Sequence, residues 1–155
     1  MTHEEKRTLV VALGASNLSR GLSRLLKASR CCSSSAVDLI VAAGHGRSYG
    51  ANSRIWKRSL PSICESGLWR SLDRLLRSGV SKNSQRLAVI TDIGNDLLYG
   101  FSTEQLAEWL EEVIHRLQQQ QFDIVIVDEK MRKSDAYKKL TTCLLYTSPS
   151  PRDRG

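Results

Sequence analysis

The sequence predicts an α/β protein in which a parallel β-sheet lies between two layers of helices, a three-layer α/β/α sandwich. Four short apolar segments have the length of strands, and segments with apolar residues at helical spacing lie between them. Strands that alternate with helices form parallel β-α-β units with right-handed crossovers. The strands also lack alternation of polar and apolar residues, which is typical of a sheet covered on both faces.

The first strand is predicted over residues 9–13 and ends in Gly14. A helix is expected next, because leucines recur on one face, at Leu18, Leu22, Leu25 and Leu26. A strand that turns sharply into a helix places the turn at the carboxyl edge of the sheet, where open α/β sheets bind ligands. Ser16 therefore lies where a nucleophile would be useful. The alternative is a helix cap, since serine and asparagine both favour that position.

A second strand is predicted over residues 37–43, and it leads into a glycine-rich loop over residues 44–50. Three glycines in seven residues allow positive φ angles and a close approach of the backbone to a ligand. The loop is not a P-loop, because the spacing differs and the Lys-Ser/Thr ending is absent. Residues 51–61 are mixed in character and are predicted to hold a short helix near Ile55 and Trp56.

The next helix is predicted from an amphipathic stripe, with Gly79 as its C-terminal stop. The stripe consists of Leu68, Leu72, Leu75 and Leu76. A third strand is then predicted over residues 86–93, and it leads into a loop that contains Gly94, Asn95 and Asp96.

The last predicted helix begins at a capping box formed by Ser102 and Gln105. Its apolar stripe consists of Leu106, Trp109, Leu110, Val113, Ile114 and Leu117. A fourth strand is predicted over residues 122–127.

Length and composition indicate a soluble globular protein. The chain has 155 residues, of which 41% are hydrophobic and 25% charged, values typical of a domain with an ordinary core. No run approaches the roughly 20 apolar residues of a membrane span. The charged N-terminus is followed by no signal-peptide cleavage pattern, so we expect a cytoplasmic protein.

The formal net charge of +7 raises the possibility of contact with anions or nucleic acid. The basic residues form no single cluster and are not interleaved with aromatic residues, which favours a solvated basic surface and argues against a nucleic-acid partner. The cysteines show no C-x-x-C spacing, and we interpret them as reduced thiols. They are Cys31, Cys32, Cys64 and Cys143.

The chain divides into an α/β domain over residues 1–142 and a tail over residues 143–155 that differs in kind. The tail resembles the conceptual translation of a sequencing adapter, so we expect it to form no part of the fold. On this interpretation the native protein continues past residue 142, and residues 129–142 lie close to the junction. The alternative is a disordered tail rich in serine and proline, which the composition also permits.

Three predicted strands end at residues with catalytic potential: Ser16, the loop over residues 44–50, and Asn95. In a parallel sheet these strand ends lie at the same edge, so the three can converge. A serine hydroxyl can attack a carbonyl carbon, while backbone N–H groups and an asparagine amide bind the oxyanion that develops. These are the parts of an acyl-transfer site.

These segments resemble the first three sequence blocks of the SGNH, or GDSL-type, hydrolases. The matching residues are Gly14-Ala15-Ser16-Asn17, Gly44-His45-Gly46-Arg47-Ser48 and Ile93-Gly94-Asn95-Asp96, and the likeness covers about residues 9–127. The resemblance implies a flavodoxin-like sandwich that hydrolyses an ester, thioester or acyl-carbohydrate bond of a small molecule without a metal or other cofactor. It makes Ser16 the nucleophile and implies three oxyanion donors, namely the N–H groups of Ser16 and Gly46 and the Asn95 side chain.

The chain departs from the family at the general base. The family takes its aspartate and histidine from an Asp-x-x-His block, and no such spacing occurs here. The three histidines are His3 near the N-terminus, His45 in the second loop and His115 beside the stripe of the long helix. We therefore expect a C-terminally truncated hydrolase with little or no activity.

Other residues near the predicted site have alternative interpretations. His45 and Arg47 are candidate substrate-loop residues, as a base and as an anion ligand respectively, the alternative for Arg47 being a solvated loop arginine. Asp92 and Asp96 are expected to order the loop around Asn95. A different function is also open, because a non-catalytic doubly wound domain could bind a phosphate or small anion with the same loops.

Overall fold

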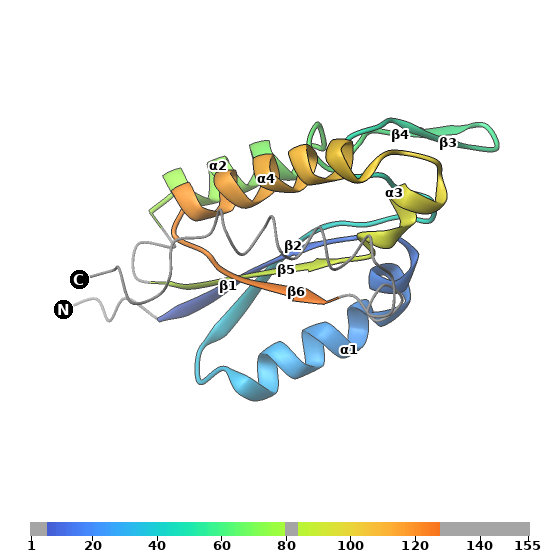
Figure 1. Ribbon diagram of the computed structural model, residues 1–155. Helices are drawn as coiled ribbons and strands as arrows, with labels where there is room; N and C mark the ends of the chain where they lie inside the picture. Colours follow the sequence, from blue (N-terminus) through green and yellow to red (C-terminus); the bar gives the residue numbers. More distant parts are fainter. Residues whose placement is uncertain (1–5, 80–83, 128–155) are drawn as a thin grey trace.

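The computed structural model describes residues 6–79 and 84–127 and has the predicted α/β fold (Figure 1). A parallel sheet of four strands lies between helix α1 on one face and helices α2 and α4 on the other. The strand order is β2-β1-β5-β6, with bounds Ala36–Ala42, Arg7–Leu13, Gln85–Thr91 and Asp123–Val127. The predicted domain junction, the tail over residues 143–155 and His3 lie outside the described residues.

Strand β1 is the central element of the sheet. It pairs with β2 and with β5 in parallel, so that Val10 lies beside Leu39 on one side and Leu87 on the other. Its residues from Thr8 to Leu13 are all buried. A strand buried on both faces needs no polar alternation, which is why the continuous apolar run predicted it correctly.

The main core lies between the sheet and the helices α2 (Leu68–Arg77) and α4 (Thr103–Gln119). The predicted stripe of α4 is buried there, apart from the half-buried Trp109. The capping box is confirmed, because the Ser102 hydroxyl accepts from the Gln105 N–H and the Gln105 side chain accepts from the Ser102 N–H, both at 3.1 Å. Gly79, with a φ of 77°, follows α2 as its predicted stop.

Helix α1 (Ser16–Cys32) lies on the other face, beside β1 and β2. Of its predicted stripe only Leu18 is fully buried. Cys31 and Cys32 are exposed at its end, and Cys64 is buried, all three as free thiols. Burial, helped by the nearby Glu112, raises the pKa of Cys64 to about 11.

The short helix predicted near Ile55 and Trp56 is wrong. These residues belong to an antiparallel hairpin of β3 (Ser53–Ile55) and β4 (Arg58–Leu60). Trp56 lies in the connecting turn with a φ of 57°. Strands of three residues are too short to show a period of two, and the turn lacks the glycine or asparagine that usually marks a tight hairpin.

The predicted loop after the third strand is also wrong in part, because residues Gly94–Leu98 form the short helix α3. Asp92 has a φ of 59°, in the left-handed region that aspartate tolerates better than most residues. The chain turns there, and the Asn95 N–H donates to the Asp92 carbonyl at 3.2 Å.

No helix within residues 6–79 and 84–127 is long and apolar enough to span a membrane.

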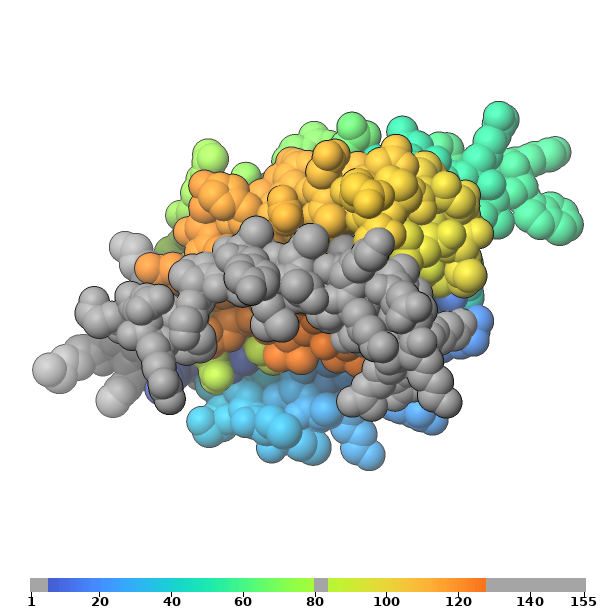
Figure 2. Space-filling model, viewed as in Figure 1, coloured from blue at the N-terminus to red at the C-terminus, as the bar shows by residue number. Residues whose placement is uncertain are grey.

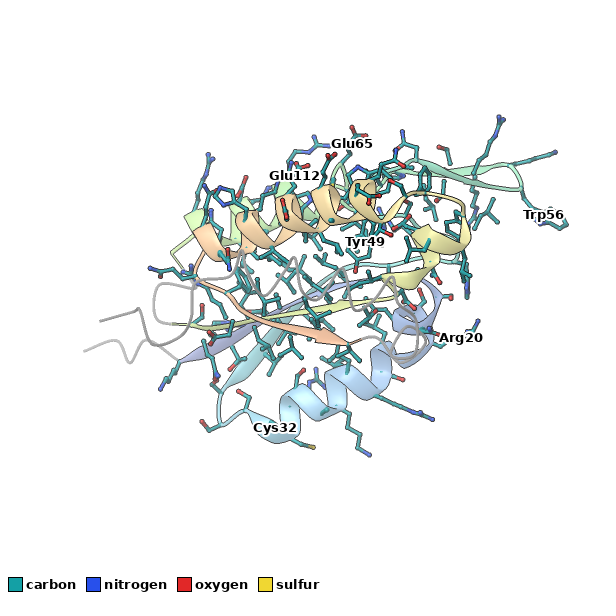
Figure 3. All side chains as sticks on the ribbon, viewed as in Figure 1. Arg20, Cys32, Tyr49, Trp56, Glu65 and Glu112 are labelled. Atoms are coloured by element: carbon teal, nitrogen blue, oxygen red, sulfur yellow. The ribbon has the colours of Figure 1, made fainter. Side chains whose placement is uncertain are left out.

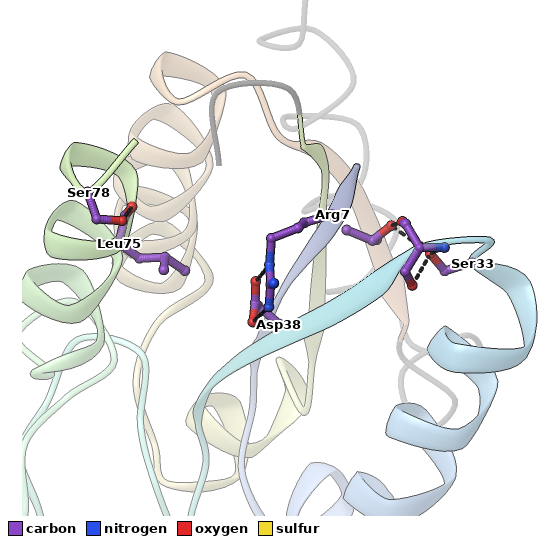
Figure 4. Close-up of polar contacts among 7 residues, drawn as sticks. Arg7, Ser33, Asp38, Leu75 and Ser78 are labelled. Carbon is purple, nitrogen blue, oxygen red and sulfur yellow. Dashed lines mark hydrogen bonds and ion pairs between the residues drawn. The ribbon is translucent and has the colours of Figure 1, made fainter. Parts of the chain in front are cut away.

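The amino end of the sheet is closed by polar side chains (Figure 4). Arg7 at the start of β1 donates to both carboxylate oxygens of Asp38 in β2, at 2.7 and 2.8 Å. The hydroxyls of Thr8, Ser33 and Ser35 hydrogen-bond to one another beside this pair. The start of β1 is therefore tied both to β2 and to the turn that precedes β2.

Candidate active site

The three segments with catalytic potential follow neighbouring strands and lie at the carboxyl edge of the sheet (Figure 1). Ser16 is the first residue of α1, just after β1. Gly46 lies in the loop after β2, and Asn95 lies in α3, after β5. Parallel pairing of adjacent strands brings these residues to one edge although they are far apart in the sequence.

Asp92 joins the end of β5 to the start of α1. Its Oδ2 accepts hydrogen bonds from the backbone N–H groups of Ala15, at 2.7 Å, and Leu18, at 3.1 Å. A carboxylate from another strand thus does the work of a helix cap. The N-cap residue is Ala15, so the interpretation of Ser16 as the cap is wrong. Asp92 thus contacts more than the loop around Asn95 that it is expected to order, because its side chain also holds the segment that contains Ser16.

Gly14 allows β1 and β5 to approach closely at this edge. A Cβ at this position would lie 2.3 Å from Thr91 Oγ1 and 3.0 Å from Asp92 Oδ2. Its N–H donates to the Ala42 carbonyl at 3.0 Å, which ties the end of β1 to the end of β2. A larger residue there would displace the side chains of Thr91 and Asp92, so only glycine preserves the hydrogen bonds that Asp92 forms at this edge.

Tyr49 connects the second loop to both neighbouring strands, and Figure 3 shows it between α4 and the sheet. Its hydroxyl donates to the Thr91 carbonyl at 2.6 Å and lies 3.3 Å from the Leu13 carbonyl. Its backbone N–H donates to Asp96 Oδ2 at 3.0 Å. This role of Tyr49 has little signal in the sequence beyond an aromatic residue within a glycine-rich loop.

Asp96 is completely buried beneath this loop. Burial raises the pKa of its carboxyl group, and the nearby Ser48 hydroxyl and the Tyr49 N–H oppose that rise. Its contact with Tyr49 links α3 to the second loop, which extends its expected structural role beyond its own turn.

The candidate oxyanion donors form no hydrogen bonds with other described residues. This holds for the N–H groups of Ser16 and Gly46 and for the Asn95 side chain, and the Ser16 hydroxyl likewise has no such partner within residues 6–79 and 84–127. Gly46 has a φ of 70°, and a Cβ there would lie 2.4 Å from Ile55 Cδ1. The positive φ angle favours glycine at this position, and a Cβ there would displace the end of the Ile55 side chain.

The other candidates of the second loop have different environments. His45 is exposed. Arg47 is half-buried, and its guanidinium donates to the carbonyls of Pro61 at 3.1 Å and Ala43 at 3.0 Å. Burial lowers the pKa of Arg47. These contacts hold Arg47 against the backbone more firmly than a fully solvated loop arginine, and its role as an anion ligand stays a prediction.

His115 is exposed on α4, as expected for a surface residue, and pairs with Gln119 at 2.9 Å. Within residues 6–79 and 84–127, neither His45 nor His115 forms a hydrogen bond with Ser16. The same residues contain no cluster of three histidine, cysteine, aspartate or glutamate side chains that could hold a metal ion.

An open cleft of about 440 Å³ begins at Gly46. Its walls come from the second loop, the β3–β4 hairpin and the segment between α3 and α4, and the Ser53 hydroxyl oxygen is buried there with no partner among the described residues. The lining residues are Gly46, Ser48, Ala51, Asn52, Ser53, Arg54, Ile55, Tyr99 and Phe101.

Comparison with solved structures finds chains that share this fold. The chain is similar to the psychrotrophic esterase EstA from Pseudoalteromonas sp., with 18% identity and a TM-score of 0.51 over 90% of this chain and 70% of that one. It is also similar to AlinE4, an SGNH-hydrolase family esterase, with 16% identity and a TM-score of 0.52 over 91% and 70% of the two chains. No family model and no curated protein sequence matches the chain.

Proposed function

We propose that the chain carries the nucleophile and oxyanion hole of an SGNH-type serine hydrolase that acts on an ester or related acyl bond of a small molecule. Ser16 is the proposed nucleophile. The N–H groups of Ser16 and Gly46 and the side-chain amide of Asn95 are the proposed oxyanion donors. The observation that carries the proposal is that these groups lie on braced segments of one sheet edge and have no hydrogen-bond partner among the described residues.

The proposed reaction begins when the Ser16 hydroxyl oxygen attacks the carbonyl carbon while a base takes its proton. The carbonyl electron pair moves onto the oxygen, which becomes an oxyanion bound by the three donors. Collapse of the tetrahedral intermediate breaks the bond to the alcohol, which leaves with the proton that the base returns, and an acyl-serine remains. A water molecule then attacks the acyl-serine by the same route and regenerates Ser16.

The proposed site has no identified general base among the described residues. A serine hydroxyl is a poor nucleophile without an adjacent base, and the two described histidines form no hydrogen bond with Ser16. The Asp-x-x-His block of the family is absent from these 155 residues. We therefore propose that the 155-residue chain hydrolyses esters slowly unless a base is supplied.

The anion-binding alternative has less support. The N-terminus of α1 would be the natural position for a phosphate, but the Asp92 carboxylate already accepts from the N–H groups of Ala15 and Leu18 there. A second negative charge would lie against this carboxylate. A neutral carbonyl that gains charge only during reaction meets less repulsion in its ground state.

Chemical rescue tests the proposal on the chain as it stands. Hydrolysis of p-nitrophenyl acetate is measured with and without added imidazole, which can act as the missing base. We expect an imidazole-dependent rate above that of S16A, and a loss of about a hundredfold or more in this Ser16-dependent rate for N95A.

S19A is the matched control, because Ser19 lies one turn further along α1 and its hydroxyl donates to the Ala15 carbonyl at 2.9 Å. It should keep the wild-type rate. Equal rates for the wild type and S16A at every imidazole concentration would refute the proposal. A fast Ser16-dependent rate without imidazole would instead show that the chain contains its own base.

A further inference from the structure

Exposed apolar side chains gather around the mouth of the cleft. Among the described residues, six large apolar side chains are exposed, and four of them come from two short segments. Ile55 and Trp56 are 37% and 95% exposed, and Leu98 and Tyr99 are 78% and 51% exposed. Ile55 and Tyr99 line the same cleft, so the two segments flank one opening.

The hairpin carries part of this apolar surface away from the body of the protein. Figures 1 and 2 show the β3–β4 hairpin projecting beyond the helices and the sheet. Trp56 lies in its turn, and Figure 3 shows the indole pointing outward from the tip. A tryptophan that is 95% exposed contributes almost nothing to the core. Its large apolar ring is therefore available to a binding partner.

The same hairpin is basic. Arg54, Lys57 and Arg58 are exposed, and within the described residues none of them forms an ion pair. The sequence from residue 39 to residue 64 contains no aspartate or glutamate. Three cations thus accompany the exposed tryptophan with no local acid to neutralise them.

We propose that this surface docks onto an anionic lipid surface, with the cleft opening toward the lipid. We call it the cleft rim, and it consists of Arg54, Ile55, Trp56, Lys57, Arg58, Leu98 and Tyr99. Tryptophan and tyrosine rings favour the boundary between lipid and water, and basic side chains beside them are attracted to acidic headgroups. The rim presents both kinds of group at one place.

A protein partner fits these observations less well. One side of a stable protein interface contributes roughly 20–30 residues, whereas the rim offers a narrow projecting tip and four apolar side chains. A tip of this kind can enter a headgroup layer without a complementary groove. The proposal concerns binding alone, so it holds or fails independently of hydrolysis at Ser16.

Sedimentation with lipid vesicles tests the proposal. Vesicles of phosphatidylcholine with and without phosphatidylserine are mixed with the wild type, with W56A, and with the triple variant R54Q/K57Q/R58Q. We expect binding to the vesicles that contain phosphatidylserine, and a fall in affinity of about tenfold or more for each variant.

The matched control is R70Q/R74Q/R77Q on α2, which removes the same number of exposed cations away from the rim. Its affinity for the vesicles should stay within about twofold of the wild-type affinity if the position of the cations, and not the net charge of the protein, determines binding. The proposal is overturned if the wild type binds no anionic vesicles, or if the two triple variants lose affinity equally. Self-association in sedimentation velocity that W56A abolishes, without vesicle binding, would also overturn it and assign the rim to a second copy of the chain.

Discussion

At the amino end of the sheet Asp38 gives both of its carboxylate oxygens to Arg7, whereas at the carboxyl end Asp92 and Asp96 each leave one oxygen unpaired among the described residues. The Ser53 hydroxyl, in the wall of the cleft, is the third such buried atom in that part of the chain. All three lie toward the end of the sheet that carries Ser16.

Buried polar groups without partners lower stability, and native proteins keep few of them. Their position at one end of the molecule distinguishes the two ends of the sheet. At the amino end both carboxylate oxygens of Asp38 are paired, whereas at the carboxyl end Asp92 and Asp96 each hold a neighbouring segment with one oxygen and leave the other oxygen unpaired near the proposed nucleophile. The predictions below test this difference, from the largest expected effect to the smallest.

Replacing Asp92 with alanine should have the largest effect. It leaves the buried N–H groups of Ala15 and Leu18 without an acceptor, and an unpaired buried donor costs about 1–3 kcal/mol. We expect the free energy of unfolding in urea to fall by about 3 kcal/mol. D73A, at an exposed position of α2, should change it by less than about 0.5 kcal/mol. A loss below about 1 kcal/mol for D92A would mean that Asp92 is not the brace of this edge.

Removing the Tyr49 hydroxyl should have the next largest effect. Y49F breaks the hydrogen bond to the Thr91 carbonyl at 2.6 Å inside the braced edge, and we expect a loss of about 1–2 kcal/mol in thermal or urea unfolding. Y99F makes the same chemical change at a side chain that is half exposed on the cleft rim. Similar losses of stability for the two variants would contradict a stabilising role that is specific to the Tyr49 hydroxyl.

The two ends should respond to pH in opposite directions. Asp96 has a raised pKa in the folded state because it is buried, so the folded protein holds this proton more tightly than the unfolded chain. Its contribution is therefore fully present below the ordinary pKa of 3.8 and is lost as the pH rises through the folded pKa. D96N should remove this decline in a series of urea unfolding curves, and a wild-type decline that persists in D96N would contradict the assignment.

Asp38 should give the smallest effect and the reverse sign. The hydrogen bonds from Arg7 lower the pKa of Asp38, so its contribution is present above 3.8 and is lost as the pH falls through the folded pKa. Both side chains are partly exposed, and we expect D38N to cost about 0.5–1 kcal/mol near neutral pH. The difference between D38N and the wild type should vanish in acid, and a difference that grows in acid would be inconsistent with this pairing.

Much of the fold was readable from the sequence, because long elements carry a clear period. The apolar stripe of α4 predicts which face of that helix is buried, and the continuous apolar sequence of β1 predicts a strand buried on both faces. The hairpin and α3 have no clear signal in the sequence, because strands of three residues and a helix of five are too short to repeat their period even twice.

The site was only partly readable. Glycine, serine and asparagine at strand ends predicted which residues reach the carboxyl edge. The bond from Ala15 to Asp92 spans 77 positions, and no local pattern in the sequence contains it. The role of Tyr49 and the exposure of Trp56 likewise depend on tertiary packing, so they emerged only from the structure.

The most direct test of Ser16 as the nucleophile is covalent labelling with an organophosphonate, whose phosphorus atom a reactive serine attacks with loss of the leaving group. The protein is incubated with a phosphonofluoridate in the presence of imidazole, and the adduct is located by mass spectrometry of its peptides. We predict a single adduct on Ser16 that S16A abolishes, that N95A slows and that S19A leaves unchanged. An adduct on another residue, or labelling of the wild type no faster than of S16A, would contradict the proposed site.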